Sequence, residues 1–428
     1  MSDTAELESV DAFAARARSW LAGNMPRAAD GLGGYNPVQR NDEAELAHIA
    51  RCRELQRMLF DGGFAGICVP TAYGGLGLTA AHQSAFNREI RGYEYPADTQ
   101  IPTFTPCMAV ILEFGTEEQK RRHVPPILKG DAFWMQFLSE PSGGSDVAGA
   151  QTTAVKDGDE WVLNGSKIWT TGAWWADWGL CLVRTNWDVP KHRGLTVFMV
   201  EIHQPGIEIH RIEMLNGSRE FCQEFLTDVR VPDSQRIGEE GQGWTVGTRW
   251  LYHERTISGG SPYVTSPAGR PAVALDPGGG SAALIPLARA RGLLHDAHAR
   301  ELIGESHALG LVGNALTDHI AEEIRSGAAS EQAAAITRLW FGVSAVRNST
   351  ISFELAGPTA VAWSQDEREI GRKGIRFLMR QTSCLAGGTT EMSRNAISER
   401  VLGMPRERTV DKDTPFRDIP RSRPAGSS

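Results

Sequence analysis

Two short segments near one third of the chain carry residues that suit ligand binding. Gly144 and Ser145, preceded by a further glycine, offer unobstructed backbone N–H groups and a hydroxyl, which suit a phosphate. Trp169 is followed by Thr170 and Thr171, so a flat aromatic side chain lies beside two hydroxyl donors, which suits a heteroaromatic ring. A plain glycine turn followed by a strand with a core tryptophan has the same pattern. The pattern alone therefore leaves both interpretations open.

The stretch that holds these residues, 137–171, has the pattern of β structure. Asp157-Gly158 and Asn164-Gly165 separate alternating runs, and Asn-Gly in that setting predicts a tight hairpin turn because both of its residues accept positive φ. Further alternating runs follow at 179–185, 195–202, 206–214 and 224–232. Their close spacing predicts a small antiparallel barrel or sandwich over residues 133–240.

Helical patterns precede this β region. Residues 1–132 read mostly as helices, among them 11–21, 42–61, 79–92 and 116–124. Thr116 begins a capping box, and Pro125-Pro126 is expected to end the helix that follows it.

Helical patterns return after the β region. Residues 241–428 contain helical segments at about 286–311, 313–326 and 330–355, which predict a domain like a four-helix bundle. A Gly- and Pro-rich stretch, 258–284, reads as a long inserted loop, and the polar tail after residue 408 as an extended or disordered arm. The predicted fold class is therefore α+β and multidomain, with domains at 1–132, 133–240 and 241–428.

Composition narrows the class of protein. The chain has 428 residues, of which 41% are hydrophobic and 22% charged, as in ordinary globular proteins. The formal net charge of −8 argues against nucleic acid as a main partner. Six scattered cysteines without a CxxC pair favour reduced thiols and no metal site. No apolar run approaches the ~18 residues of a membrane span, and the acidic N-terminus lacks a signal-peptide core, so we expect a cytoplasmic protein without membrane attachment.

A long motif connects these observations to a known family. The segment LSEPSGGSDVAG…DGDEWVLNGSKIWTTGA resembles the flavin-binding signature of the acyl-CoA dehydrogenase family, and it follows a helical N-terminal third as it does in that family. LAGGTTEMSRNAISERVLGMPRE resembles the closing flavin motif of the family. The resemblance runs from about Asp11 to Arg408 and is weakest over 258–290. It implies FAD as cofactor and an acyl-CoA as substrate.

The resemblance assigns cofactor contacts by position in the motifs. Gln136, Leu138 and Ser139 match residues at the pyrimidine edge of the flavin, and Trp169 matches a residue packed against the ring. Thr171 matches a residue near flavin N5, and Ser145 one near phosphate or pantetheine groups. The remaining cofactor positions are Thr170, Gly144, and Gly388 and Thr389 in the closing motif.

Two further cofactor positions depart from the family pattern. Many members carry Arg-Gln-x-Phe-Gly, which reaches the cofactor of a neighbouring subunit, whereas this chain has Arg300-Glu301-Leu302-Ile303-Gly304. A Gly-Gly-x-Gly stretch for the adenine end is here Leu-Ala-Gly-Pro, with Gly357 as its glycine. Similar departures occur in actinobacterial-type members that act on bulky acyl-CoA esters, including sterol side chains. Some of those assemble from unlike subunits, so the resemblance implies a homo- or hetero-oligomer, a dimer or tetramer.

The catalytic base also departs from the common pattern. Most members carry a glutamate where this chain has Gly387, which keeps only the backbone N–H that helps bind the thioester carbonyl. A minority carry the base directly before a helix arginine, and Glu254 followed by Arg255 matches them. The resemblance thus implies Glu254 as base and Arg255 as a substrate contact. A Glu-Arg pair on a helix is otherwise most often solvated surface, and neighbouring His253 reads as a surface or core histidine.

The implied reaction is α,β-desaturation of the thioester. A base removes the α-proton, donors stabilise enolate charge, and flavin accepts the β-hydride because side chains cannot. An electron-transfer flavoprotein is the expected reoxidant. Two alternatives remain open: a flavin-dependent oxidase or monooxygenase on the same scaffold, which rapid oxygen consumption by the reduced enzyme would favour, and a non-catalytic partner subunit, which a colourless purified chain would favour.

Overall fold

The computed structural model describes residues 7–28, 41–256, 261–265, 280–362, 368–385, 387–406 and 412–419. The chain divides into two compact units. The first unit comprises Met1–Arg270 together with Thr409–Ser428, and the second comprises Pro271–Arg408. Each unit is described by itself.

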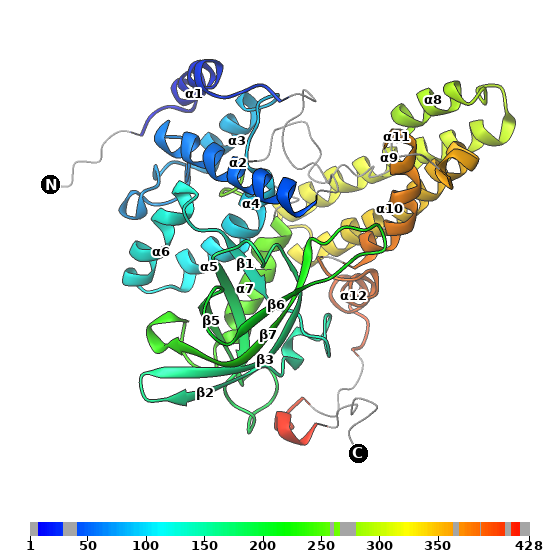
Figure 1. Cartoon of the computed structure of the whole chain (residues 1–428). Helices are drawn as coiled ribbons and strands as arrows, with labels where there is room; N and C mark the ends of the chain where they lie inside the picture. The colour runs from blue at the N-terminus through cyan, green and yellow to red at the C-terminus, as the bar shows by residue number, and fades with distance from the viewer. Residues whose placement is uncertain are drawn as a thin grey trace. The chain divides into compact units, whose positions relative to one another are not determined.

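The first unit begins with helices, drawn in blue and cyan in Figure 1. They are α1 (Val10–Asn24), α2 (Asp42–Asp61), α3 (Ala80–Glu89), α4 (Ala97–Pro102), the π-helical segment η2 (Thr103–Met108), α5 (Ala109–Phe114) and α6 (Glu117–Lys129). Asn41 caps α2, because its side chain accepts a hydrogen bond from the N–H of Ala44 at 2.8 Å. Thr116 and Gln119 form the predicted capping box of α6.

The predicted end of α6 at Pro125-Pro126 is wrong. The helix continues through both prolines to Lys129 and ends at Gly130, whose φ is +77°. Each proline inside a helix costs about 3 kcal/mol, so the two together cost about 6 kcal/mol. The neighbouring side chains of Val124, Ile127 and Leu128 are fully buried, and each contributes roughly 1.5–3 kcal/mol by leaving water. Tertiary burial therefore outweighs the local preference.

The middle of the chain forms one eight-stranded sheet. Its strands are β1 (Trp134–Phe137), β2 (Thr153–Asp157), β3 (Glu160–Thr171), β4 (Trp178–Arg184), β5 (Leu195–Glu201), β6 (Ile207–Arg211), β7 (Phe221–Pro232) and β8 (Arg236–Ile237). The order is β6-β7-β3-β2-β4-β5-β8, and β1 pairs with β4. Most neighbours are antiparallel, whereas β1 and β2 run parallel to β4. The turn predicted at Asp157-Gly158 is confirmed, because Asp157 pairs with Glu160 and Gly158 has φ +62°.

The hairpin predicted at Asn164-Gly165 is wrong. Strand β3 runs through both residues, and a bulge interrupts its pairing with β7 there. The Asn164 side chain instead forms two hydrogen bonds with Asp228 on β7. Its amide NH₂ donates to the Asp228 carboxylate at 3.0 Å, and its amide oxygen accepts from the backbone N–H of Asp228 at 2.9 Å. Gly165 has φ +152°, and an added Cβ would lie 2.6 Å from the Thr152 hydroxyl, so the bulge requires glycine.

Helix α7 (Gly243–Thr256) follows the sheet. It packs against β5 and against the run η2–α5, as Figure 1 shows beside the sheet. Gly243 permits this approach, because an added Cβ would lie 2.4 Å from the backbone of Leu195. Val246 and Trp250 of α7 are fully buried in a core that helices and sheet share. The helix is therefore held on the sheet by close packing.

The second unit is helical. Its described helices include α8 (Gly280–Ala290), α9 (Ala297–Ser326), α10 (Ala334–Ala356), α11 (Arg368–Met379) and α12 (Thr390–Ala396). The predicted break near residue 312 is wrong, since α9 is continuous there. The chain breaks instead where Gly292 takes φ +69° and Asp296 caps α9 by accepting from the N–H of Ala299 at 2.8 Å.

The predicted loop and tail are partly structured. Helix α8 begins at Gly280, inside the predicted loop 258–284, while residues 257–260 and 266–279 lie outside the described residues. Within the tail, which belongs to the first unit, Phe416 is buried, with the Arg184 guanidinium 3.6 Å from its ring centre. The described part of the tail therefore packs on the sheet. No described helix has both the length and the hydropathy needed to cross a membrane.

Candidate active site

Glu254 lies on the buried side of α7. The buried residues of this helix, among them Gly243, Val246 and Trp250, recur at helical spacing, and Glu254 follows Trp250 by four positions on the same stripe. Glu254 is half-buried, whereas the next residue, Arg255, is exposed. The helix therefore turns the two charged side chains of the Glu-Arg pair into different surroundings.

The surroundings of Glu254 favour its protonated form. Burial raises the pKa of Glu254, and the positive charge of Arg255 opposes this shift. Cys107, fully buried in η2, is close enough that the charge of Glu254 adds to burial in raising the pKa of its thiol. A carboxyl whose pKa is moved toward neutrality is suited to accept a proton from carbon and to release it again.

A hydrogen-bonded chain joins α7 to the motif residues on the sheet. The indole N–H of Trp250, one helical turn before Glu254, donates to the side-chain oxygen of Gln136 on β1. The hydroxyl of Thr170 on β3 lies 3.2 Å from the carbonyl oxygen of Gln136. The structure thus brings Gln136, Thr170 and the helix of Glu254 together, as expected if they serve one site.

Trp169 has an unusual backbone for a bulky residue. Its φ is +67°, in the left-handed region, and it lies at the second bulge between β3 and β7. The side chain is 52% exposed, and its ring meets that of Phe221 edge-on at 5.9 Å between centroids. Strained residues of this kind concentrate at ligand sites. An exposed indole face held by a bulge fits the predicted stacking on a ring.

We predict that Trp169→Ala weakens retention of the flavin. Stacking of a base-like ring on an aromatic side chain is worth about 1–3 kcal/mol, which corresponds to roughly a 5- to 150-fold rise in dissociation constant. Flavin absorbance after equilibrium dialysis measures the change. Leu215→Ala, at a 73% exposed apolar side chain of the same unit, is the control. Equal flavin content in both variants would contradict the stacking role of Trp169.

A buried ion pair holds the segment that follows β1. The ammonium of Lys167 lies 2.8 Å from a carboxylate oxygen of Glu140, and both side chains are almost fully buried. Lys167 also donates to the carbonyl of Leu138 at 3.3 Å, and the N–H of Ile168 donates to the carbonyl of Ser139 at 3.0 Å. The predicted flavin-edge residues Leu138 and Ser139 are thus fixed along β3, and both are half-buried.

The predicted phosphate segment is open. Gly144 and Ser145 are exposed, and an added Cβ at Gly144 would meet no atom within 4 Å among the described residues. Thr171, at the end of β3, is exposed as well. These three positions are exposed and therefore accessible to a ligand.

Glu224 on β7 is a buried carboxyl next to this chain of contacts. Its Oε2 lies 2.9 Å from the Thr170 hydroxyl, while its Oε1 has no hydrogen-bond partner among the described residues. The single Thr170 proton cannot serve both Glu224 and the Gln136 carbonyl, which only accepts. Both contacts are satisfied when Glu224 is protonated and donates. Burial accordingly raises the pKa of Glu224 to about 8.

We predict that Glu224 makes stability depend on pH. Between about pH 5 and 8 the folded chain keeps a proton that the unfolded chain has lost, so the free energy of unfolding falls as pH rises, by up to about 1.4 kcal/mol per pH unit. Glu224→Gln has no carboxyl group to titrate, so its free energy of unfolding does not fall in this way. The stability of Glu224→Gln relative to wild type is therefore expected to rise between about pH 5 and 8. Urea unfolding at several pH values measures the difference. Glu208→Gln, at an exposed position of β6, is the control, and a difference that stays constant with pH would contradict a neutral Glu224.

The closing motif lies in the second unit. Gly387 and Gly388 have φ of +70° and +96°, so both positions favour glycine over any residue with a side chain. Thr389 caps α12, accepting a hydrogen bond from the N–H of Met392 at 3.1 Å. The motif therefore forms a glycine turn that leads into a helix N-terminus.

The two departures from the family pattern also lie in the second unit. Arg300 is exposed in the first turn of α9. Gly357 ends α10 with φ +61°, and an added Cβ would lie 2.7 Å from the Arg291 guanidinium. Gly357 thus has a structural reason to be glycine besides the predicted adenine contact.

Sequence reasoning missed four residues that hold this site: Glu140, Lys167, Glu224 and Trp250. A signal for two of them was present. Lys167 is in phase with buried Leu163 along β3, and Glu224 is in phase with buried Leu226 along β7. A charged residue at an inward position of an alternating strand predicts a buried polar network.

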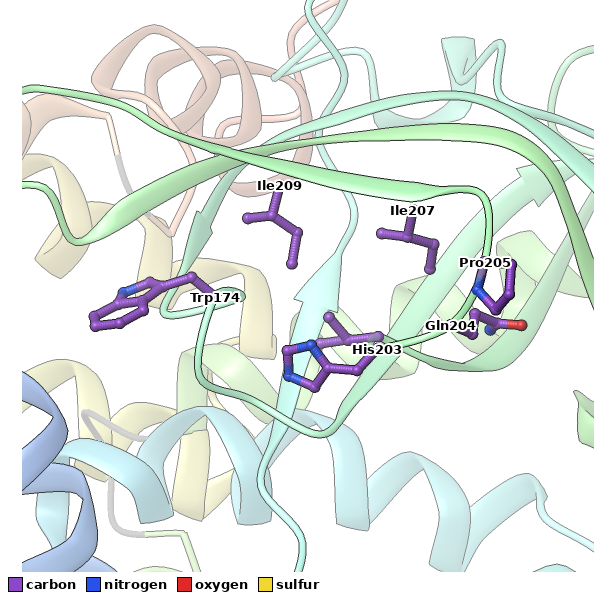
Figure 2. A pocket seen from close by; sticks show the side chains of 7 residues that line it. Trp174, His203, Gln204, Pro205, Ile207 and Ile209 are labelled. Carbon is purple, nitrogen blue, oxygen red and sulfur yellow. The ribbon is translucent and has the colours of Figure 1, made fainter.

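A separate hollow lies away from these residues. It has a volume of about 560 Å³ and lies beside the edge strand β6. Figure 2 shows Ile207 and Ile209 pointing from that strand toward Trp174 and His203. None of the predicted site residues lines this hollow, and it is not part of the candidate site.

Comparison with known proteins defines the class of this enzyme. The model of the acyl-CoA dehydrogenase N-terminal domain matches residues 35–131, and that of the acyl-CoA dehydrogenase middle domain matches residues 136–246. The chain belongs to the acyl-CoA dehydrogenase family. It is an oxidoreductase of the CH–CH class in a family of FAD-dependent flavoproteins.

Particular relatives match more than nine tenths of the chain. Acyl-CoA dehydrogenase IpdE1 of Mycobacterium tuberculosis is 30% identical over 433 residues, which cover 94% of this chain and 99% of the relative. A solved variant of the Tcur3481-Tcur3483 steroid ACAD is similar with a TM-score of 0.69 and 26% identity, covering 93% of this chain and 99% of that one. A chain of the ChsE4-ChsE5 complex from Mycobacterium tuberculosis is similar with a TM-score of 0.68 and 26% identity, and the match covers 95% of this chain and 100% of that one. The predicted fold class is confirmed.

The residues of the first unit fit a flavin. An exposed indole at a strained bulge, the polar groups of the β1 segment and the open glycine turn are of the kinds that stack on a ring, hydrogen-bond its edge and approach a phosphate. Within the described ranges, no group of three or more His, Cys, Asp or Glu side chains could hold a metal ion, and the lack of a metal site stays a prediction for the chain as a whole.

Proposed function

We propose that this enzyme desaturates an acyl-CoA thioester between its α- and β-carbons, with Glu254 as the base. The observation that carries the proposal is the placement of Glu254 on the buried stripe of α7, one turn beyond the tryptophan that bonds Gln136. A solvated carboxylate on an outward helix face would not support this role.

The chain's own residues divide the work. Glu254 takes the α-proton, and burial raises its pKa, which favours the protonated form that results. Trp250 and Gln136 position the helix of Glu254 relative to β1. When bound, FAD supplies the hydride acceptor for the β-carbon. Gln136, Leu138, Ser139, Trp169, Thr170 and Thr171 are proposed to hold its ring.

The remaining contacts are proposed from the family resemblance. In the first unit, Gly144 and Ser145 are proposed to approach phosphate or pantetheine groups, and Arg255 to contact substrate. In the second unit, the N–H of Gly387 is proposed to bind the thioester carbonyl. Gly388, Thr389, Arg300 and Gly357 are proposed as cofactor contacts.

The substrate class is proposed from the relatives. A steroid enzyme and the two-component ChsE4-ChsE5 complex share this fold at 26% identity. We therefore propose a bulky acyl-CoA from lipid or sterol side-chain breakdown, an oligomer of like or unlike subunits, and an electron-transfer flavoprotein as reoxidant.

Anaerobic titration of the purified, flavin-loaded protein tests this function. Straight, branched and polycyclic acyl-CoA esters are added in turn, and bleaching of the flavin absorbance is followed. We expect bleaching by at least one bulky ester at near-stoichiometric amounts. A protein that stays yellow with every ester, yet loses its colour with a chemical reductant, would contradict desaturase activity.

A further inference from the structure

A second hollow lies beside α7, and His253, the residue before the candidate base, is part of its lining. Its volume is about 440 Å³, within the range of small-molecule sites. Its polar lining comes from the segment before α3, from α5, α6 and α7, and from the described segment 261–265. The residues used below are Tyr73, Glu113, Lys120, Arg249, His253 and Tyr263.

Two residues of α7 bind one carboxylate at this hollow. Arg249 and His253 are one helical turn apart, and they contact the two oxygens of Glu113 at 2.7 and 2.9 Å. Against the effect of burial, both partners hold the pKa of Glu113 below its ordinary value. Glu113 is therefore an ionised group whose charge Arg249 already balances.

A further cation remains at the hollow. The Lys120 side chain is only 17% exposed, and its ammonium lies 3.6 Å from the exposed carboxylate of Glu117 on the same helix. That distance exceeds a good charge-assisted hydrogen bond, and Glu117 also accepts from the Tyr73 hydroxyl at 2.7 Å. The lining itself thus holds two permanent cations, Lys120 and Arg249, and one carboxylate, Glu113, while the exposed Glu117 pairs with Lys120 from outside the lining.

Tyr263 adds a hydrogen-bond donor. Its hydroxyl has no partner among the described residues, although the side chain is half-buried at the hollow. Burial, together with the nearby Cys68 and Glu113, raises the pKa of Tyr263, so the phenol stays protonated. The phenol is therefore a donor that a ligand in this hollow can accept from, beside the Lys120 ammonium.

The hollow is within reach of an acyl group that reacts at Glu254. His253 precedes Glu254 in the chain. The charge of Glu254 affects the pKa of Cys107, so the two side chains are close. Cys107 belongs to the same continuous helical run, η2–α5, as Glu113, which lines the hollow. Six residues of helix span about 9 Å. A chain or ring system of about eight to ten carbons covers that distance.

We propose that this hollow binds a carboxylate at the far end of the acyl group, held by Lys120 and Tyr263, so that the enzyme prefers acidic, ω-carboxylated acyl-CoA esters. The proposal rests on the proposed function for the location of the thioester at Glu254. The phosphates of coenzyme A are a second source of the same anionic chemistry, and the experiment separates the two.

A matched pair of ligands tests the proposal. Sebacoyl-CoA carries the terminal carboxylate, and decanoyl-CoA has the same ten-carbon chain with a methyl end. Dissociation constants of both esters and of coenzyme A alone are measured anaerobically by calorimetry on the flavin-loaded protein. The proteins are the wild type, Lys120→Met and the control Lys129→Met, which removes a lysine of the same helix that does not line the hollow.

We expect wild type and Lys129→Met to bind sebacoyl-CoA at least about tenfold more tightly than decanoyl-CoA. Lys120→Met is expected to lose most of this preference through weaker binding of sebacoyl-CoA, with decanoyl-CoA unchanged. Equal binding of the two esters by wild type would overturn the proposal. A loss shared by both esters and coenzyme A would also overturn it, because it would place a phosphate at Lys120.

The two proposals fail in different ways. If sebacoyl-CoA binds with the expected preference but no ester bleaches the flavin, the desaturase function fails while the carboxylate site stands. If esters bleach the flavin without any preference for the carboxylate, the function stands and the carboxylate site is rejected.

Discussion

Replacement of Glu254 by glutamine is expected to leave a yellow, folded protein that acyl-CoA esters no longer bleach. The amide keeps the size of the side chain but cannot accept the α-proton. Loss of a general base typically slows a reaction by 10²–10⁴-fold, and we expect at least about 10³-fold here, because removal of a carbon-bound proton begins the reaction. Anaerobic stopped-flow absorbance of the flavin measures the rate constant for reduction.

Two controls isolate the proton-transfer role of Glu254. Glu240→Gln makes the same chemical change at an exposed position just before α7 and is expected to reduce the flavin at the wild-type rate. Glu254→Asp keeps a carboxylate on a shorter side chain and is expected to be slow but active. Rapid bleaching of the flavin by acyl-CoA in Glu254→Gln would reject Glu254 as the base.

The second large effect is expected on stability. Lys167→Met removes one partner of the buried pair with Glu140, which leaves an uncompensated carboxylate among the strands. Breaking a buried ion pair in this way costs about 3–5 kcal/mol. The Lys167 charge and the N–H groups of Gln151 and Thr152 now hold the pKa of Glu140 below its ordinary value, although burial favours the neutral form. The urea midpoint, followed by tryptophan fluorescence, is expected to fall strongly.

An exposed lysine of the same sheet provides the comparison for Lys167. Lys156→Met, on β2, removes a solvated charge and is expected to change the free energy of unfolding by less than about 0.5 kcal/mol. Because Lys167 also bonds the carbonyl of Leu138, we further expect Lys167→Met to bind flavin less tightly. Equal midpoints for the two variants would mean that the buried pair contributes nothing to the sheet.

Strong periodicity made part of the fold predictable. The bounds of α2 agree with the predicted 42–61, and β5 agrees within one residue, because the apolar pattern and the capping residues indicate the same ends. The candidate site could be predicted only by using the family motifs together with the apolar periodicity of the sequence. Helical spacing places Glu254 after Trp250, but spacing alone does not say which stripe of a helix is buried.

The errors share one physical cause, since contacts distant in sequence overrode local preference. Asn164 forms hydrogen bonds with Asp228 on the neighbouring strand and does not close a turn. Pro125 lies inside a helix because the side chains next to it are buried. The buried charges were missed for the same reason. Lys167 and Glu140 are separated by 27 residues in the chain, and nothing in either local segment names the other as its partner.

A structure of the flavin-loaded protein with a bound, non-desaturable acyl-CoA analogue would show whether Glu254 meets the reacting carbon. We expect a carboxylate oxygen of Glu254 within about 3–3.5 Å of the substrate α-carbon, with the flavin ring against Trp169 on the opposite side of the thioester. A thioester whose α-carbon meets a different acid, or a Glu254 side chain turned to solvent while the ring lies away from Trp169, would contradict this expectation.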